Sequence, residues 1–493
     1  MRKIFIKSLI ILMILVFPLS QHSTSSKLKN QQIIHSRSTF HSNWKVILDK
    51  SGNENQVLSL QNIYPPLWCS VTDLGTLGGD HSEARGINDL SHVVGGSRIA
   101  PSSFTMHTFL WTETGGMVDL GEGEFARAYD INELGQIVGD LNQNAFLWTK
   151  EDGYINLGSL GSGSANASAI NENGMVVGSS VVSGNFHAFY WTQQEGMQDI
   201  GSLGGVGATA SDVNNQGQIV GSSYINANER HAYVWTEQDG FRDLGFTGFN
   251  YTAAAGINNM GQIVGCSMNT SDFYGTNHAV LWTEEGVPID LGRFEDNPTE
   301  AWHINDDQQI VGGFWTSPNG SKHFFLCENG YMREIKVGQE WELEHIADIN
   351  NNLLMVGWGK VDINNDGIFD ETHALLLIPF PDTFIDIQPG NSINHINPKS
   401  NGVIQVAIFT TQDFDVRDVD TSTILFGRTG YEASPKRISL KDVEKDGDMD
   451  MILQFKIRDT GIQCGDTVAY ITGMTLGNQS FRGFDSIKTV GCK

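Results

Sequence analysis

The chain has few basic residues and little charge overall. Of its 493 residues, 31 are Lys or Arg and 57 are Asp or Glu, which gives a formal net charge of -26 at pH 7. Binding to phosphate backbones or anionic lipid surfaces needs clustered Lys and Arg, so this balance argues against nucleic acid and membrane surfaces as partners. The charged fraction of 18% is below the usual value of about 25%, and the 55 glycines exceed the usual glycine content of about 7%. Together they favour turn-rich β structure over coiled coil or disorder.

The chain also lacks an apolar run of the roughly 20 residues that a membrane-spanning helix needs. Arg2, Lys3 and Lys7 precede a shorter uncharged stretch at 8–19. This arrangement is typical of a secretory signal peptide, so we expect residues 1–20 to be removed, with a membrane anchor as the alternative. No Cys follows the stretch, which argues against a lipoprotein. We therefore expect a secreted monomer, extracellular or periplasmic, with no membrane span after cleavage.

Cysteine is scarce, with five in the whole chain. Cys464 and Cys492 lie in one short C-terminal module, where an exported protein could oxidise them, so we expect a disulfide between them. Cys69, Cys266 and Cys327 have no metal-ligand spacing such as CxxC and are expected to be buried or free thiols.

What the chain does contain is a repeat. An Ile/Val-Asn pair is followed seven residues after its Asn by the Gly of a Val-Gly pair or its equivalent. The seven asparagines, which number repeats 1 to 7 in this article, are Asn88, Asn132, Asn171, Asn214, Asn258, Asn305 and Asn350. Their intervals of 39 to 47 residues are close to the length of a four-stranded propeller blade.

Each repeat divides into four short β signals. In repeat 4 these are 211–214, 218–221, 231–236 and 243–245, with a tight Asn-x-x-Gly turn between the first two. The fourth signal, Asp-Leu-Gly or similar, starts at Asp73, Asp119, Asn156, Asp199, Asp243, Asp290 and Glu334.

The fourth signal is offset along the array. Its first copy precedes repeat 1, and repeat 7 has none of its own after its third strand. We therefore predict an all-β fold, a seven-bladed β-propeller over 68–380 in which residues 71–75 close the ring in a 3+1 arrangement. An open β-solenoid is the alternative, but it does not explain the offset.

The array resembles the HAF family of extracellular bacterial repeats. The resemblance rests on the ordered Asn, Val-Gly, His-Ala-aromatic, Trp-Thr and Asp-Leu-Gly elements, with His187, Ala188 and Phe189 as the name-giving triplet. It implies a secreted repeat protein and no particular biochemical activity. Because the recurring His and Trp residues occur in nearly every repeat, we interpret them as scaffold and not as a catalytic set.

Two acidic loops have the spacing of calcium ligands. The pattern DxNxDGxxD places oxygen ligands at Asp362, Asn364, Asp366 and Asp370, with the carbonyl of Ile368 added. A similar spacing recurs later in the chain. Its candidate ligands are Asp442, Glu444, Asp446, Asp448 and Asp450. We expect calcium at both loops, and a solvated acidic turn is the alternative for each.

The repeat stops near residue 380, and alternating strand patterns begin. They predict a C-terminal β-sandwich over 384–493. The segments at 386–390, 396–400, 459–466 and 489–493 resemble a domain common on secreted bacterial and archaeal proteins, a resemblance that implies no function by itself. Residues 21–67 are expected to be a flexible lead-in.

Residues that break the repeat are the candidates for function. The loops that lead into the first strands are bland in repeats 3 to 5 but rich in acids, His and Trp in repeats 6, 7, 1 and 2, which a closed ring makes neighbours. The ligand-binding candidates are Asp80, His81, Glu83, Glu300, Trp302, His303, Glu342 and His345. They could bind a cation, a basic partner or a sugar, and a solvated acidic rim is the alternative.

The pattern favours a calcium-stabilised binding protein whose partner is an extracellular glycan or protein. No HExxH motif and no Ser-His-Asp order is present, so no catalytic residue is predicted. The alternative is a secreted carbohydrate-active enzyme, a hydrolase or lyase, with its site on the same loop face.

Overall fold

The computed structural model describes residues 66–492, except 122, 162, 246–248, 273–275, 317–319, 339, 363–368, 381, 392, 412–413 and 478–479. The predicted signal peptide and nearly all of the lead-in lie outside the described residues. The all-β prediction is confirmed, since the described helices are three 3-10 turns: η1 (Thr270–Asp272), η2 (Val416–Asp418) and η3 (Ile457–Asp459). None of the described helices has the length and apolar character to cross a membrane.

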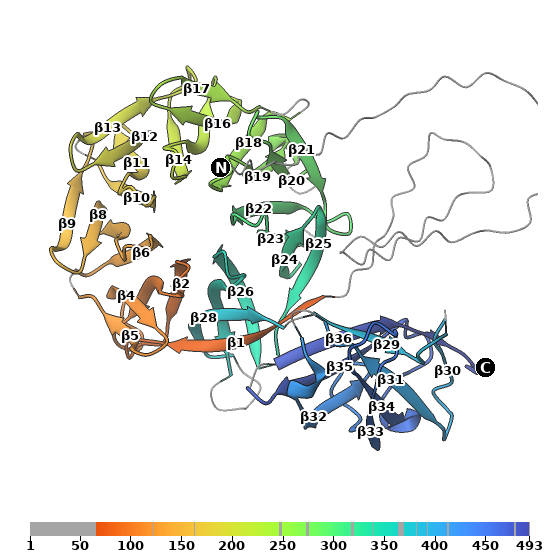
Figure 1. Cartoon of the computed structure of the whole chain (residues 1–493). Helices are drawn as coiled ribbons and strands as arrows, with labels where there is room; N and C mark the ends of the chain where they lie inside the picture. Colours follow the sequence, from red (N-terminus) through yellow and green to blue (C-terminus); the bar gives the residue numbers. More distant parts are fainter. Residues whose placement is uncertain are drawn as a thin grey trace, which may run out of the picture. The chain divides into compact units, whose positions relative to one another are not determined.

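The repeat region contains four sets of strands (Figure 1). The first strands are β2 (Ser82–Ile87), β6 (Ala126–Ile131), β10 (Ala165–Ile170), β14 (Ala208–Val213), β18 (Tyr251–Ile257), β22 (Thr299–Ile304) and β26 (Trp341–Ile349). The second strands are β3 (Val93–Arg98), β7 (Ile137–Leu141), β11 (Val176–Val182), β15 (Ile219–Tyr224), β19 (Ile263–Met268), β23 (Ile310–Trp315) and β27 (Met355–Val361). The third strands are β4 (Met106–Thr112), β8 (Asn144–Thr149), β12 (Asn185–Thr192), β16 (Arg230–Thr236), β20 (His278–Trp282), β24 (Lys322–Glu328) and β28 (Glu371–Pro379). The fourth strands are β5 (Gly116–Asp119), β9 (Gly153–Gly158), β13 (Gly196–Gly201), β17 (Gly240–Asp243), β21 (Pro288–Gly292) and β25 (Tyr331–Lys336).

Repeat 7 receives its fourth strand from the other end of the array. β1 (Leu67–Gly75) pairs antiparallel with β28, from Cys69 opposite Pro379 to Gly75 opposite Ala374. In repeats 1 to 6 the fourth strand follows the third directly in the chain and pairs with it in the same antiparallel sense.

The seven repeat asparagines form a closed ring of hydrogen bonds. Each side chain donates from Nδ2 to the backbone oxygen of the next asparagine at 2.9–3.1 Å, and Asn350 donates to Asn88. Each Oδ1 also accepts from the backbone N–H four residues later, at 2.8–3.0 Å. Because these side chains are buried, only an amide, which both donates and accepts, satisfies the position.

The glycine that follows each asparagine by seven residues is required by a close backbone approach. A Cβ at Gly221 would lie 1.9 Å from the carbonyl oxygen of Thr209 in the first strand, and the equivalent glycines give 1.9–2.1 Å. The first strand shifts register immediately after this point, as between Ala210 and Asp212. The glycine therefore accommodates a bulge in every first strand.

The recurring His residues are satisfied strand residues, as the repeat pattern predicts. His231 Nδ1 lies 2.9 Å from Asp243, the acid of the fourth strand. The same carboxylate accepts the backbone N–H of Gly245 at 2.7 Å. His373 reproduces this pair with Asp73 at 2.9 Å, across the junction between β28 and β1.

Each repeat sheet packs against its neighbours through apolar side chains. One core cluster joins Val220 and Ala232 of repeat 4 with Ile257 and Val280 of repeat 5. Another joins repeat 7 to repeat 1, with Leu376 beside Ile87 and Phe109. The first strands lie toward the middle of the repeat region (Figure 1), so their side chains from different repeats can meet.

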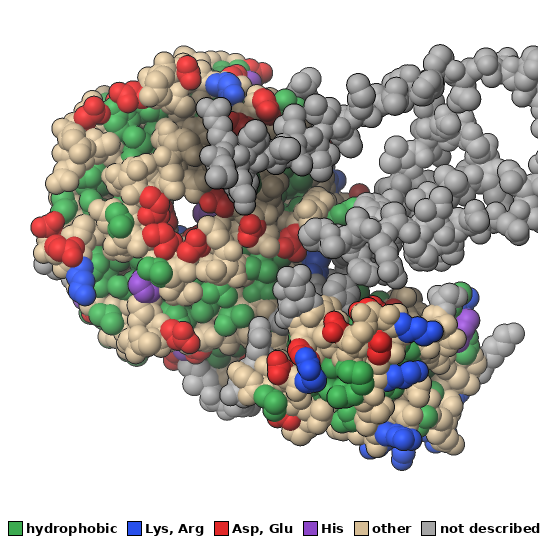
Figure 2. All heavy atoms as spheres, in the orientation of Figure 1, with side chains coloured by type: hydrophobic (Ala, Val, Ile, Leu, Met, Phe, Trp, Pro, Cys, Tyr) green, Lys and Arg blue, Asp and Glu red, His purple; other side chains and the backbone are tan. Residues whose placement is uncertain are grey.

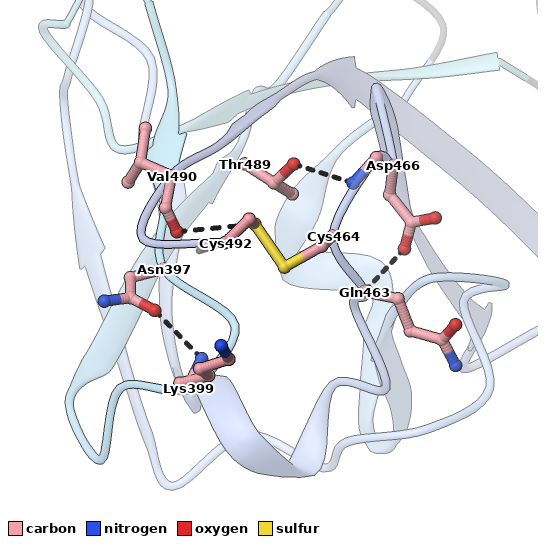
Figure 3. The surroundings of a disulfide bond; sticks show 9 residues. Asn397, Lys399, Gln463, Cys464, Asp466, Thr489, Val490 and Cys492 are labelled. Carbon is pink, nitrogen blue, oxygen red and sulfur yellow. Dashed lines mark hydrogen bonds between the residues drawn. A yellow bond between two sulfur atoms is a disulfide. The ribbon is translucent and has the colours of Figure 1, made fainter.

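The C-terminal module has its own core and one disulfide. A single sheet path runs β32-β35-β36-β29-β31-β34-β33, and the short strands β30 and β37 pair separately. Their bounds are β29 (Asp382–Ile387), β30 (His395–Ile396), β31 (Val403–Ile408), β32 (Val419–Gly427), β33 (Arg437–Lys441), β34 (Asp450–Lys456), β35 (Val468–Thr475), β36 (Ser480–Ser486) and β37 (Lys488–Thr489). The structure joins Cys464 to Cys492, with Cα atoms 5.7 Å apart (Figure 3).

Candidate functional site

The residues that break the repeat gather where the first strands begin. In each first strand, the residue five positions before the ring asparagine is Glu83, Arg127, Asn166, Thr209, Ala253, Glu300 or His345. The turns that contain the asparagines lie at the other end of these strands, so the two sets of residues face opposite sides of the repeat region.

Glu83 is the centre of a three-residue ionic group in repeat 1. His81 Nε2 lies 2.8 Å from Glu83 Oε1, and Arg85 Nε donates to Glu83 Oε2 at 3.1 Å. Burial alone would raise the pKa of Glu83, but the hydrogen bond from His81 and the charge of Arg85 outweigh it and hold the pKa at about 2. This carboxylate is therefore ionised and already paired.

His345 is the centre of a second group, formed by repeats 6 and 7. Lys322 Nζ lies 2.8 Å from His345 Nδ1, and the ring centroids of Trp302 and Trp358 lie 4.8 Å and 4.5 Å from the imidazole. Burial, with the nearby charges of Lys322 and Arg85, lowers the pKa of His345 to about 3. The imidazole is neutral at physiological pH and accepts the hydrogen bond from Lys322.

The two groups are in contact with each other. The guanidinium of Arg85 lies 5.1 Å from the ring centroid of Trp358 in repeat 7 and 5.3 Å from that of Tyr129 in repeat 2. Residues from both ends of the array thus meet, as the closed ring predicts. We call this set the His345 cluster: Glu83, Arg85, Glu300, Trp302, Lys322, His345 and Trp358.

Glu300 is the member of the His345 cluster on the repeat 5 side. Its carboxylate accepts from Asn277 Nδ2 at 2.6 Å and from Trp302 Nε1 at 3.3 Å. Lys322 lies over the Trp302 ring, 4.6 Å from its centroid. Burial lowers the pKa of Lys322 to about 8, although Glu300 and Glu344 oppose the shift. The cluster therefore combines acids, cations and aromatic rings within one face.

His303 lies apart from the His345 cluster, among acids of the other first strands. It stands two positions before its ring asparagine, and its Nδ1 is 3.4 Å from Asp348 Oδ1. Asp130 and Asp212 occupy the same position in repeats 2 and 4. Asp130 Oδ2 accepts the backbone N–H of Ile170 in the next repeat at 2.8 Å, so these acids link neighbouring repeats.

These acids predict a pH-dependent stability. Burial, reinforced by the charge of Asp348, raises the pKa of Asp130 to about 8, and burial raises that of Asp348 to about 7. The pKa of Asp in an unfolded chain is about 3.9. Between these values the folded state binds more protons, so stability falls as pH rises from about 4 to about 8. Asp130→Asn is expected to make this fall less steep in urea unfolding at several pH values.

The control for Asp130→Asn is Asp152→Asn, which changes an exposed acid of the same repeat. It should leave the pH dependence as it is in the unmodified protein. If Asp130→Asn left the pH dependence of stability unchanged, Asp130 would have the same pKa in the folded and unfolded states, which would contradict the prediction.

Two more of the predicted ligand-binding residues, Asp80 and Glu342, lie outside the His345 cluster. Asp80 binds Arg98 at 2.9 Å and accepts the backbone N–H of Ser102 at 2.9 Å, so it holds a loop of repeat 1. Glu342 is exposed and stands opposite Lys360 in the sheet. The structure thus brings together His81, Glu83, Glu300, Trp302 and His345, and it places Asp80, His303 and Glu342 outside that group.

Sequence reasoning missed the partners of the His345 cluster and a cavity beside it. Lys322 and Arg230 both occupy the position before the recurring His of the third strand, which is Met106 in repeat 1. Comparison of this position across repeats would have found them. The cavity, of about 480 Å³, lies over repeats 4 to 6. Its residues in repeats 4 and 5 belong to the repeats with bland loops, whereas Glu300 and Trp302 of repeat 6 are predicted ligand-binding residues.

The structure describes only some of the predicted calcium ligands. In the first loop Asn364, Asp366 and Ile368 lie outside the described residues, whereas Asp362 and Asp370 flank the gap. In the second loop Asp450 is buried and accepts the backbone N–H groups of Val443 and Thr410. Among described residues, no group of three or more His, Cys, Asp or Glu is arranged to hold a metal ion.

The other acids of the second loop are arranged around its own backbone. Asp442 accepts the N–H of Lys445 at 2.6 Å, and Asp446 accepts that of Asp448 at 3.0 Å. Lys445 and Gly447 have φ values of +63° and +105°, so the loop turns sharply at this point. Calcium at both loops stays a prediction.

Comparisons with known proteins add little beyond the fold class. No family model and no curated protein matches the chain. Similar solved structures include a fungal alcohol oxidase of the AA5 family in complex with copper, at 11% identity over 85% of this chain and 98% of that one, with a TM-score of 0.41.

Two further similar structures are β-propeller proteins. TolB from Acinetobacter baumannii is 10% identical over 52% of this chain and 66% of that one, with a TM-score of 0.33. A gluconolactonase from Xanthomonas campestris is 12% identical over 54% and 95%, with a TM-score of 0.32. Likenesses this distant carry no argument about function.

Proposed function

We propose that the chain is a secreted, calcium-stabilised binding protein. In this proposal a seven-bladed β-propeller of the HAF type, closed in a 3+1 arrangement by β1, precedes a C-terminal β-sandwich. One observation supports the binding role above all others. The hydrogen bonds that recur in every repeat belong to the scaffold, whereas the residues that break the repeat meet in the His345 cluster on one face.

Binding is favoured over catalysis by the state of Glu83 and His345, although Lys322, with its pKa of about 8, titrates near physiological pH. Glu83 is ionised and paired with Arg85, and His345 is neutral and bound to Lys322. A general acid or base needs a pKa near the working pH and a proton to exchange with substrate. Paired ions beside Trp302 and Trp358 instead form a fixed polar and aromatic surface of the kind that binding proteins present. The partner would be an extracellular glycan or protein.

The proposal predicts the effect of a double substitution in the His345 cluster. Glu83→Gln with Arg85→Gln removes both charges and the contacts of Arg85 with Trp358 and Tyr129. Binding to partners found on arrays of glycans and surface proteins should fall at least about tenfold, because substitution within a desolvated, hydrogen-bonded charge pair at an interface typically costs about 2–5 kcal/mol.

The matched control is Asn166→Ala with Ser168→Ala, which changes the same two strand positions in repeat 3. It should leave binding within about twofold, a change in free energy of less than about 0.5 kcal/mol. Melting temperatures of both variants would separate lost binding from lost folding. Equal binding by the two variants would contradict a site in the His345 cluster, and no binding by the unmodified protein would contradict the function.

The calcium part of the proposal has its own test. A cation that binds only the folded state stabilises it by about 2.7 kcal/mol at a hundredfold excess over the dissociation constant. We expect Ca²⁺ to raise the melting temperature and EDTA to lower it, and Asp366→Ala to remove most of the response, with Asp446→Ala removing the remainder.

Asp152→Asn serves as the control for calcium, because it removes a single exposed acid from another part of the chain. It should leave the response to EDTA unchanged. A melting temperature that EDTA does not shift in the unmodified protein would remove both calcium loops from the proposal.

A further inference from the structure

A recess on the repeat region lies over repeats 4 to 6. Its volume is about 480 Å³, which falls within the range of small-molecule sites. Its lining comes from the starts of three first strands and from the second and third strands beside them. The lining includes Thr209, Arg230, Tyr251, Ala253, Ala255, Glu300 and Trp302.

The recess exists because repeat 5 has small side chains where repeat 6 has large ones. Ala253 and Ala255 occupy the strand positions that Glu300 and Trp302 occupy in repeat 6. The missing volume leaves a gap walled by Trp302 on one side and Arg230 on the other. A segment that looks featureless in sequence thus forms the floor of the cavity.

The cavity has one hydrogen-bonding cation and one hydrogen-bonding anion. Arg230 donates from one terminal nitrogen to Thr209 Oγ1 at 2.8 Å, but its buried Nε has no hydrogen-bond partner within the described part of the chain. Glu300 is held by Asn277 and Trp302 and keeps acceptor capacity, since each carboxylate oxygen has two lone pairs. The Arg230 guanidinium also lies over the rings of Tyr224 and Tyr251, 5.4 Å and 5.8 Å from their centroids, so a ligand acceptor would reach it from the side that lines the cavity.

We infer that this cavity binds one or two rings of an uncharged saccharide. A sugar hydroxyl both donates and accepts, so neighbouring hydroxyls can satisfy Arg230 and Glu300 together without a net charge. The apolar C–H faces of the ring would lie against Tyr251, Trp302 and the two alanines. The inference rests on the proposed binding function and adds a ligand class and a location.

An uncharged ligand fits this cavity better than an ion. Arg230 and Glu300 balance each other and are each partly paired, so neither requires a counter-charge from the ligand. An anionic ligand would also approach a chain of net charge -26 against repulsion. The cavity opens beside the His345 cluster through Glu300 and Trp302, so a longer glycan could contact both.

Saturation-transfer difference NMR on the full secreted chain tests the inference. The probes are D-glucose, D-galactose, D-mannose, N-acetylglucosamine and cellobiose, with glycine and diglycine as zwitterionic comparisons. From the free energy of binding per non-hydrogen atom that is usual for small ligands, we expect at least one saccharide to bind with a dissociation constant of about a few millimolar. Neither zwitterion should compete with it.

Ala253→Trp fills the cavity from its floor and should weaken saccharide binding at least about tenfold. The matched control is Asn166→Trp, which puts the same side chain at the same strand position in repeat 3 and should leave affinity within about twofold. Arg230→Gln gives a second variant that leaves the cavity open, and it should also weaken binding.

Absence of transfer to every saccharide would overturn the inference, and so would preferential binding of glycine or diglycine. Saccharide affinity unchanged in both Ala253→Trp and Arg230→Gln would overturn it as well. If the arrays identify a partner whose binding depends on Glu83 and Arg85 but not on Ala253, the cavity assignment fails while the proposed function stands.

Discussion

Removing residues 21–75 is expected to leave a protein that aggregates, whereas removing 21–60 should leave thermal stability nearly unchanged. The longer deletion takes away β1, and with it the antiparallel pairing to β28 and the bond between Asp73 and His373. Leu67 and Leu74 of β1 are buried, and each contributes about 2 kcal/mol through burial alone. With the lost pairing, the total loss of about 5 kcal/mol or more approaches the whole stability of a domain.

The exposed edge of β28 explains why aggregation should follow. Leu375 and Leu377 are fully buried, and without β1 the strand would present unpaired backbone groups beside them. Size-exclusion chromatography and thermal unfolding measure both effects. Equal melting temperatures for the two deletions would contradict the role of β1.

The second large effect is expected at the asparagine ring. Asn214→Ala removes donors to Asn258 O and Gln218 Oε1 and the acceptor for the Gln218 backbone N–H. Of the groups left without partners, Asn258 O is buried and the two groups of Gln218 are partly buried, and each buried group costs about 1–3 kcal/mol. We expect Asn214→Ala to lower the free energy of unfolding by about 3–5 kcal/mol, measured by urea denaturation.

The neighbouring residue provides a matched control. Asn215 also belongs to a ring, in which its side chain accepts the backbone N–H of Glu172 at 2.9 Å, but it lies nearer solvent. Figure 2 shows acidic side chains gathered around the central opening of the repeat region on the face in view. The Asn215 side chain lies near solvent, so water can replace its lost hydrogen bond. Asn215→Ala should therefore lower the free energy of unfolding by about 1 kcal/mol. Equal losses for the two variants would mean that burial of the ring does not govern its contribution.

Much of the scaffold was predictable because each repeat imposes the same local requirement. A buried amide at Asn214 and a close approach at Gly221 recur in every repeat, so the sequence shows them as fixed spacings. The offset of the fourth strand indicated that β1 pairs with β28 before any contact was known. The pairing of Cys464 with Cys492 followed from their place in one module.

The candidate site was less predictable because it depends on contacts between repeats. That repeats 6, 7, 1 and 2 meet was predictable, but which side chains point together was not. His303 and His345 look alike in sequence, yet one lies beside Asp348 and the other beside Lys322. Ala253 gave no functional signal in the sequence, because a small side chain forms a cavity only where the side chains around it are larger. Those side chains come from other repeats, so their positions were not known from the sequence.

The His345 cluster is a single site because the two ends of the repeat array meet in one sheet. Ser70 and Ile378 stand opposite each other in β1 and β28. The nearby Cys69 is buried, and burial raises the pKa of its thiol, so it should not compete for oxidation. Oxidation of Ser70→Cys with Ile378→Cys, followed by mass spectrometry of the digested protein, should yield a disulfide-linked peptide joining positions 70 and 378. Free thiols at both positions in the folded, oxidised protein would contradict the closure.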